Sequence, residues 1–242
     1  MDYLYDGTFE GLMTAVYYHY KKEKASGIYQ LTKYQQSIVF LAEIVKTDIS
    51  KAKTVSDAIN KLISREAYIN IYYCYLSNAD GKENLILDFL IFAFKYGKNI
   101  MNFYTHEKVL PINEIYKRVA REEHRILGIL RFSDIGGILY AKYSPDNDIS
   151  ILLADHFADR YKHEKFIIYD EKRKKAVIYS DNNWEIEENI IIDNIEFSVN
   201  EKRIQNLWKQ YFTDLAIKER KNLNLQFQFV PARYRKNMAE FK

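Results

Sequence analysis

The chain of 242 residues carries 36 basic and 33 acidic side chains, a net charge of +3, and 48% hydrophobic residues. This is enough apolar material for one large or two small domains, and no apolar run reaches the roughly 20 residues that cross a membrane. The acidic N-terminus lacks a secretory-signal pattern. Cys74 is the only cysteine, which excludes an internal disulfide and a thiolate cluster. We therefore expect a cytoplasmic protein without a metal site or cofactor.

The N-terminal residues predict a strand followed by a helix. Tyr3–Tyr5 form a short alternating pattern that stops at the turn signal Asp6-Gly7, and Thr8 has the side chain of a helix N-cap. We expect this strand to join the sheet that the later part of the chain forms.

Helical periodicity dominates the stretch Thr47–Tyr104. Its most apolar segment, Asn84–Phe103, is expected to be a buried central helix, and Gly97 is the residue where we expect that helix to break. Two shorter helices, over Thr54–Ser64 and Arg65–Leu76, are expected before it.

After Arg131 the apolar period changes to two, which predicts strands. Gly136-Gly137 indicates a hairpin between Phe132–Ile135 and Ile138–Ser144. A second hairpin is expected between Lys165–Tyr169 and Ala176–Ser180.

Two helices complete the predicted elements. Pro145–Asp148 is expected to cap a helix over Ile149–Lys162. A last amphipathic helix is expected over Asn200–Arg220, and the residues from Leu223 onward read as extended, with a turn at Pro231. The inward face of the last helix is predicted to hold Ile204, Leu207, Trp208, Tyr211 and Leu215.

Together these elements predict an α+β fold, with a mostly helical lobe packed on a small antiparallel sheet built from two β-hairpins. We expect a single family domain over residues 1–242. Within it, residues 30–131 would form the helical lobe, and residues 1–29 plus 132–242 the α+β lobe.

The densest group of chemically active side chains lies in the helix that Pro111 opens. At about 100° per residue, its apolar side chains form one core-facing stripe. Glu122 lies on one flank, within reach of Arg118 or Arg125, and His124 lies on the other. The face opposite the stripe carries Arg118, Arg121 and Arg125. The stripe itself consists of Ile112, Tyr116, Val119, Ile126 and Leu130.

Two interpretations of this helix stay open. Glu122 and His124 can transfer protons while Arg121 and Arg125 clamp a phosphate, or the charges can form a solvated, ion-paired face. Glu123 falls at the centre of the apolar stripe, where a carboxylate needs a partner or a raised pKa. It is therefore either a residue of a tilted helix that reaches a partner or a catalytic carboxylate.

The C-terminal residues alternate aromatic rings with cations. Arg233, Tyr234, Arg235 and Lys236 combine the stacking and the charge that bind nucleic acid. The same segment can instead dock its rings on the core. Residues 218–242 carry seven basic and two acidic side chains, whereas residues 177–201 carry seven acidic and no basic ones. The two segments can therefore also neutralise each other.

The two histidines of the helix over Ile149–Lys162 and its end do not predict a metal site. His156 and His163 are seven residues apart, about 10 Å along a helix, which is too far for one shared metal ion. Because His156 falls among apolar positions, we expect a hydrogen-bonded core histidine.

Several short motifs occur in an order that resembles one bacterial family, whose members are described as DNA metabolism or DNA repair proteins and contain a domain of unknown function. The resemblance covers nearly the whole chain. It departs at Glu123, where a small residue is usual, and at Arg235 and Asn237, where aromatic residues are expected. The motifs are Tyr5-Asp6-Gly7-Thr8-Phe9-Glu10-Gly11, Arg121-Glu122-x-His124-Arg125 with Phe132, Pro145-Asp146, His156-Phe157 and Pro231-x-Arg233-Tyr234.

The resemblance implies an association with DNA repair, but no established catalytic residues. In that family the domain can follow a uracil-DNA-glycosylase-like domain and tends to accompany a radical-SAM protein. This chain carries no glycosylase domain and looks like the stand-alone form.

We therefore expect an accessory protein in DNA metabolism or repair that binds DNA weakly, a radical-SAM partner, or both. The alternatives are an enzyme acting on nucleic acid or a nucleotide with Glu122 and His124, and a pure protein adaptor. An open face shared by the arginines and the tail would favour nucleic-acid binding. A deep pocket lined by Glu122 and His124 would favour an enzyme, and a large exposed apolar patch an adaptor.

Overall fold

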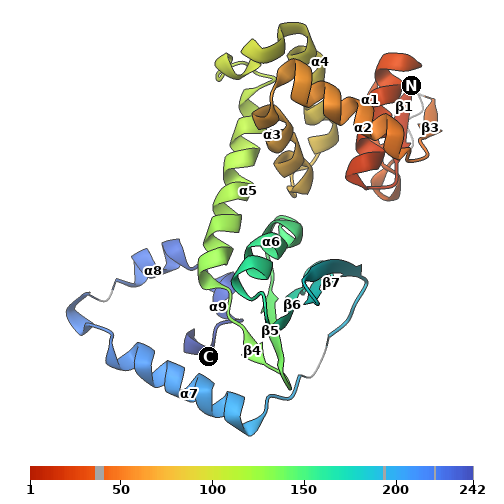
Figure 1. Ribbon diagram of the computed structural model, residues 1–242. Helices are drawn as coiled ribbons and strands as arrows, with labels where there is room; N and C mark the ends of the chain where they lie inside the picture. The colour runs from red at the N-terminus through yellow and green to blue at the C-terminus, as the bar shows by residue number, and fades with distance from the viewer. Residues whose placement is uncertain (36–40, 193–194, 221, 242) are drawn as a thin grey trace. The chain divides into compact units, whose positions relative to one another are not determined.

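The computed structural model describes residues 1–35, 41–192, 195–220 and 222–241 (Figure 1). The chain is an α+β protein, as predicted, and forms two compact units, Met1–Ala120 and Arg121–Lys242. Each unit has its own β-sheet, and neither sheet is the purely antiparallel one that the sequence predicts. Within the described ranges, no helix is long and apolar enough to cross a membrane.

A parallel three-stranded sheet lies in the N-terminal unit, in the order β2-β1-β3. The central strand β1 (Asp2–Tyr5) is buried along its length between β2 (Gly27–Gln30) and β3 (Ala42–Ile44). The expectation that Tyr3–Tyr5 joins the later hairpins is therefore wrong. The central strand of a parallel sheet is covered on both faces. The Tyr-Leu-Tyr pattern therefore belongs to a strand that is buried on both sides, not to an edge strand with one face in solvent.

Helix α1 (Phe9–Lys21) connects β1 to β2. As predicted, Thr8 caps it, because its hydroxyl accepts a hydrogen bond of 2.9 Å from the backbone N–H of Gly11.

The rest of the N-terminal unit is helical, as the sequence predicts. Helix α4 (Lys82–Tyr96) is its most apolar helix and ends at Gly97, whose positive φ of 58° suits a residue without a side chain. The other helices are α2 (Ile49–Ala58), which continues as a π-helical turn over Ile59–Ile63, α3 (Arg65–Leu76), a 3₁₀ turn over Gly97–Asn102, and α5 (Leu110–Ile129), which extends past Ala120.

The C-terminal unit contains a mixed five-stranded sheet in the order β4-β5-β6-β7-β8. Both predicted hairpins are confirmed, as β4–β5 and β6–β7. Helix α6 (Ser150–Arg160) links β5 and β6, which are parallel, and packs against β7 and β8 (Figure 1). The strands are β4 (Ser133–Asp134), β5 (Ile138–Tyr143), β6 (Lys165–Asp170), β7 (Lys175–Ser180) and β8 (Asn183–Glu188).

The edge strand β8 is absent from the sequence prediction, which treats this stretch only as acidic. It pairs with β7 across a two-residue turn in which Asp181 and Asn182 both have positive φ, 51° and 63°. Among residues with a side chain, Asn and Asp tolerate that conformation best, so this pair is a hairpin signal. Glu185 and Glu187 are exposed between half-buried Trp184 and Ile186, as expected for a strand with one wet face.

The regular elements of the C-terminal segment are all helical. The prediction of an extended chain from Leu223 onward is therefore wrong. An extended segment needs a neighbouring strand to pair its backbone groups, whereas a helix pairs them within the segment. Asn222 supports this helix by accepting a hydrogen bond of 3.0 Å from the N–H of Leu225. The elements are α7 (Val199–Asp214), a 3₁₀ turn over Lys218–Arg220, α8 (Leu223–Phe229), α9 (Ala232–Arg235) and a 3₁₀ turn over Ala239–Phe241.

The apolar face of α7 is exposed, whereas the sequence predicts that it faces inward. Leu207, Tyr211 and Leu215 keep between 55% and 61% of their surface in solvent. The periodicity is correct, but periodicity alone does not say what covers the stripe.

Candidate functional site

The buried side of α5 contains a carboxylate, and it is Glu122 rather than Glu123. Glu122 is 5% exposed, while Glu123 is half-buried. The predicted apolar stripe is rotated relative to the buried face of α5, because the prediction places Tyr116 in the stripe and Ile115 is the residue that is buried. The buried positions of α5 follow the spacing Ile112, Ile115, Val119, Glu122 and Ile126.

Four hydrogen bonds converge on the Glu122 carboxylate. Its Oε1 atom accepts from the backbone N–H of Asp146 at 2.7 Å and from the hydroxyl of Tyr234. Its Oε2 atom accepts from the backbone N–H of Asn147 at 2.9 Å and from the Asn147 side-chain amide at 2.6 Å. The Pro145–Asp148 loop therefore binds α5 through Asp146 and Asn147, whereas the sequence predicts a cap on α6, whose N-terminus has no side-chain cap.

The hydrogen bonds keep Glu122 ionised. Burial raises its pKa, but the bonds from Tyr234, Asp146 and Asn147 act in the other direction, and the net pKa is below the usual value. The pKa of Tyr234 is raised to about 12, by burial and by its bond to Glu122. At neutral pH the pair is thus a carboxylate and a neutral phenol that donates to it.

Arginines hold the other side of the same loop. Arg233 forms an ion pair of 2.7 Å with Asp146 and stacks on the ring of Tyr234, 4.7 Å from the ring centre. Arg173 donates to the backbone carbonyl oxygens of Pro145 and Asp146 and pairs with Asp170 at 2.8 Å. We call Glu122, Asp146, Asn147, Arg233 and Tyr234 the Glu122 cluster.

Three of the motifs that carry the family resemblance meet in this cluster. Glu122, Asp146 and the Arg233-Tyr234 pair come from separate motifs, and all belong to the C-terminal unit. The remaining predicted residues of α5 lie outside the cluster. Arg118, Arg121 and His124 are exposed and Arg125 is half-buried, and among the described residues none of these arginines forms an ion pair.

The other two cations predicted to bind nucleic acid, Arg235 and Lys236, are also engaged within the C-terminal unit. Lys236 pairs with Glu171 at 2.8 Å. Arg235 lies 3.9 Å from the ring centre of Phe227 and 4.6 Å from that of Phe241, and donates to the carbonyl of Val230. The acidic partners that the tail finds, Asp146 and Glu171, lie outside residues 177–201, which the sequence analysis considers for this role.

His156 is exposed on α6, so the expectation of a core histidine is wrong. The buried face of α6 is Ser150, Leu153, Ala154 and Phe157, and His156 lies one position away from it. In the described part of the chain, no group of three His, Cys, Asp or Glu side chains could hold a metal ion.

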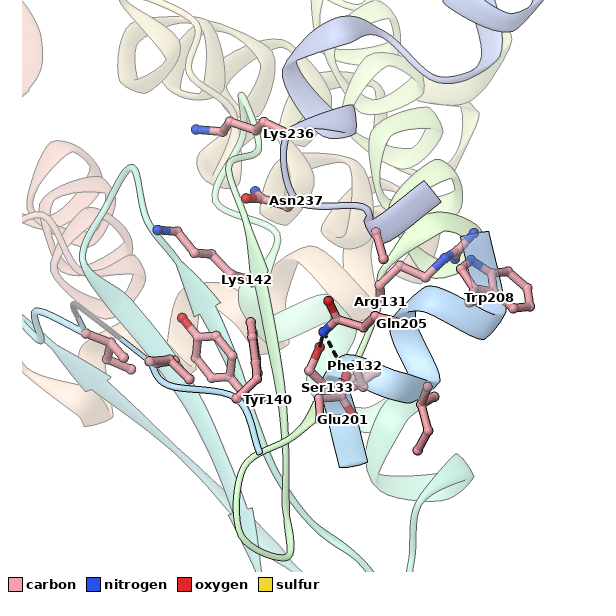
Figure 2. Close-up of a pocket in the computed structure, with 15 residues that line it drawn as sticks. Arg131, Phe132, Ser133, Tyr140, Lys142, Glu201, Gln205, Trp208, Lys236 and Asn237 are labelled. Atoms are coloured by element: carbon pink, nitrogen blue, oxygen red, sulfur yellow. Dashed lines mark hydrogen bonds between the residues drawn. The ribbon is translucent and has the colours of Figure 1, made fainter. Parts of the chain in front are cut away.

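A separate pocket of about 830 Å³ opens beside α7 (Figure 2). We call it the α7 pocket. Neither Glu122 nor His124 lines it, and of the predicted site residues it includes only Lys236. Its lining residues are Arg131, Phe132, Ser133, Tyr140, Lys142, Ile192, Ile195, Phe197, Glu201, Ile204, Gln205, Trp208, Lys236, Asn237 and Ala239.

Polar groups on one wall of the α7 pocket bind one another. Glu201 is 5% exposed and accepts from the backbone N–H of Asp134 at 3.2 Å and from Gln205 at 2.8 Å. Gln205 also donates to the hydroxyl of Ser133 at 3.1 Å (Figure 2). These contacts fix the first two turns of α7 against β4.

The opposite wall carries cations. Lys142 and Lys236 both pair with Glu171, at 2.7 and 2.8 Å, and Figure 2 shows their ammonium ends pointing to the same side. Hydrogen bonds from the two lysines lower the pKa of Glu171 to about 2. The lining comes from β4 and β5, the residues just before β4, the residues between β8 and α7, α7 itself and the C-terminal segment, so no local sequence pattern could have identified this pocket.

Residues 80–240 match the model of the domain of unknown function DUF4130, a range that includes the Glu122 cluster and the α7 pocket. No curated protein matches the chain.

Proposed function

The chain belongs to the DUF4130 family, and from that premise we propose that it is an accessory protein of DNA metabolism or repair that acts by binding a partner protein. The observation that supports this most is the exposed apolar surface of α7 and the segment after it. Twelve large apolar side chains between residues 199 and 229 are at least 40% exposed, whereas single exposed apolar residues are normal on soluble proteins. They are Val199, Ile204, Leu207, Trp208, Tyr211, Phe212, Leu215, Ile217, Leu223, Leu225, Phe227 and Phe229.

The arrangement on α7 is that of a recognition helix. Ile204, Leu207, Trp208 and Tyr211 follow the i, i+3, i+4, i+7 spacing by which an amphipathic helix lies in a groove of another protein. The family resemblance points to a radical-SAM protein as the partner.

A pull-down with the purified radical-SAM protein of the same organism tests this proposal. The double variant Leu207→Glu/Leu215→Glu puts two charges on the apolar face, where the residues it replaces are 55% and 61% exposed, so the fold should persist. The control Asn206→Glu/Thr213→Glu adds the same charge to the other side of α7. We expect the first variant to lose the partner and the control to keep it. If wild type and both variants retain equal amounts, or if none retains any, the proposal is wrong.

Direct binding of nucleic acid is the second candidate, and it is supported by the arginines of α5. Arg118, Arg121 and Arg125 form no ion pair among the described residues, whereas Arg233 is paired with Asp146. Replacing Arg121 and Arg125 by Gln should therefore reduce the slope of log affinity against log salt by roughly 1.8 on duplex DNA. Arg233→Gln should leave that slope unchanged. Fluorescence anisotropy at several salt concentrations measures both, and an absence of binding at low salt would end this candidate.

The enzymatic alternative has the least support. Glu122 already accepts four hydrogen bonds, and its lowered pKa is the opposite of what a general acid needs at neutral pH. His124 is exposed and lines no part of the α7 pocket.

A further inference from the structure

We propose that the α7 pocket binds a nucleotide, with the base held against the aromatic wall and the phosphate held by Lys142 and Lys236. The pocket shares Ile204 and Trp208 with the exposed apolar surface of α7, but Leu207 and Leu215, the two residues changed in the partner-binding test, do not line it, so the two proposals are tested with different variants.

The size of the pocket suits such a ligand. A volume of about 830 Å³ lies within the range of roughly 300–1,000 Å³ in which small-molecule ligands and cofactors bind. Four of its fifteen lining residues are aromatic, namely Phe132, Tyr140, Phe197 and Trp208. Trp208 lies at the edge of the pocket and is 40% exposed. Its ring stacks with that of Tyr211, and the guanidinium of Arg131 lies 5.8 Å from the ring centre. Such surfaces bind planar heteroaromatic rings.

Two buried polar atoms in the lining have no hydrogen-bond partner among the described residues. They are the hydroxyl of Tyr140, a residue that is 5% exposed, and the side-chain amide nitrogen of Asn237. Buried donors are normally paired, and leaving one unpaired is costly. A water molecule could serve either atom alone. Because both atoms line one roomy pocket, a single ligand with several polar atoms on its edge, such as a nucleobase, can serve them together.

The charges of the pocket favour an anion. Arg131, Lys142 and Lys236 line it, and Glu201 is the only lining carboxylate within the described chain. Arg131 is neutralised by an ion pair of 2.8 Å with Glu240, so the two lysines carry the charge that is available to a ligand. Two lysines share the single carboxylate of Glu171, so this edge keeps one positive charge without a matching partner. A planar ring, polar edge atoms and an anionic group coincide in a nucleotide.

Isothermal titration calorimetry of the full chain with nucleoside monophosphates tests the inference. Nucleosides and ribose 5-phosphate serve as ligands that lack the phosphate or the base. Short single-stranded oligonucleotides show whether the nucleotide comes free or within a strand. We expect at least one mononucleotide or oligonucleotide to bind, and each half-ligand to bind at least roughly tenfold more weakly, since each loses one set of contacts.

Three variants locate the binding. Tyr140→Phe removes a hydroxyl that bonds to no described residue, so thermal stability should stay the same while affinity falls roughly three- to tenfold. Asn237→Leu should have a similar effect on affinity, and Lys236→Gln should weaken binding and its salt dependence. The matched control Lys162→Gln changes an exposed lysine outside the pocket.

Failure of every nucleotide to bind at millimolar concentration would overturn the inference, and water would then be the partner of Tyr140 and Asn237. Equal binding of ribose 5-phosphate and the whole nucleotide would also overturn it, as would unchanged affinity in all three variants. None of these results bears on the radical-SAM pull-down, so the two proposals can fail separately.

Discussion

Replacing Glu122 by Gln should destabilise the C-terminal unit strongly, although the two side chains have nearly the same shape. With its carbonyl oxygen in the Oε1 position, the introduced glutamine would keep the bonds from Asp146 and Tyr234. Its NH₂ group would then face the backbone N–H and the side-chain amide of Asn147, which are both donors at present. Two buried donors would lose their acceptor, at roughly 1–3 kcal/mol each, so we expect a loss of about 2–5 kcal/mol.

Urea unfolding followed by tryptophan fluorescence measures this loss, because Trp184 and Trp208 both belong to the C-terminal unit. The control is Glu164→Gln, which removes the charge of an exposed glutamate in the same unit and should change stability by less than roughly 0.5 kcal/mol.

Tyr234→Phe provides a second control on the reasoning. It removes one of the four bonds to Glu122 and should cost roughly 1–3 kcal/mol, and its effect should not add fully to that of Glu122→Gln, since the two residues are in contact. The exposed control should unfold with a free energy within roughly 0.5 kcal/mol of wild type. If the free energy of unfolding of Glu122→Gln is equally close to wild type, the hydrogen bonds of the Glu122 cluster do not stabilise the unit.

Three other predictions concern the carboxylate of Glu171, the guanidinium of Arg235 and the metal content of the protein. Glu171 has a pKa of about 2 instead of 4.5, so its contribution to stability is complete above pH 4.5 and is lost as the pH falls toward 2. Glu171→Gln should therefore make the melting temperature depend less on pH in the acid range. An unchanged profile would count against the ion pairs with Lys142 and Lys236. Arg235→Lys should lower stability by roughly 0.5–2 kcal/mol, because lysine cannot stack its charge between Phe227 and Phe241 as a planar guanidinium does; equal unfolding midpoints would contradict this. Elemental analysis should find no stoichiometric zinc or iron, since burial raises the pKa of the only thiol, Cys74, to about 12; metal that is lost together with the fold on chelation would disprove it.

Local signals in the sequence predict local structure well in this chain. The Thr8 cap, the break at Gly97 and the Gly136-Gly137 hairpin each depend on a few adjacent residues, and the structure contains all three. The strand Tyr3–Tyr5 is predicted correctly as a strand, but its partners lie 25 and 40 residues further on, and nothing in its own pattern identifies them.

The candidate site shows the same division between local and distant information. The sequence singles out α5 and Glu122, but it does not give the direction of Glu122, because the predicted stripe uses Tyr116 instead of Ile115 and its centre is therefore displaced toward Glu123. The acceptor role of Glu122 depends on residues 24 to 112 positions away. The exposed face of α7 is unpredictable for another reason, since an amphipathic pattern is the same whether a core or a partner covers it.

The bond between Glu122 and Tyr234 also has a consequence for synthesis on the ribosome. The two residues are 112 positions apart, which corresponds to roughly 6–22 seconds of translation. Asp146 and Asn147 are synthesised 24 and 25 residues after Glu122, but the Tyr234 hydroxyl is missing from the centre of the α5 face during the whole interval. A leucine at position 122 would expose more apolar surface to other nascent chains. An ionised carboxylate is well hydrated, and burying it against an apolar surface is costly. A charged residue in the buried face therefore lets the emerging helix stay soluble until the C-terminal residues arrive to close over it.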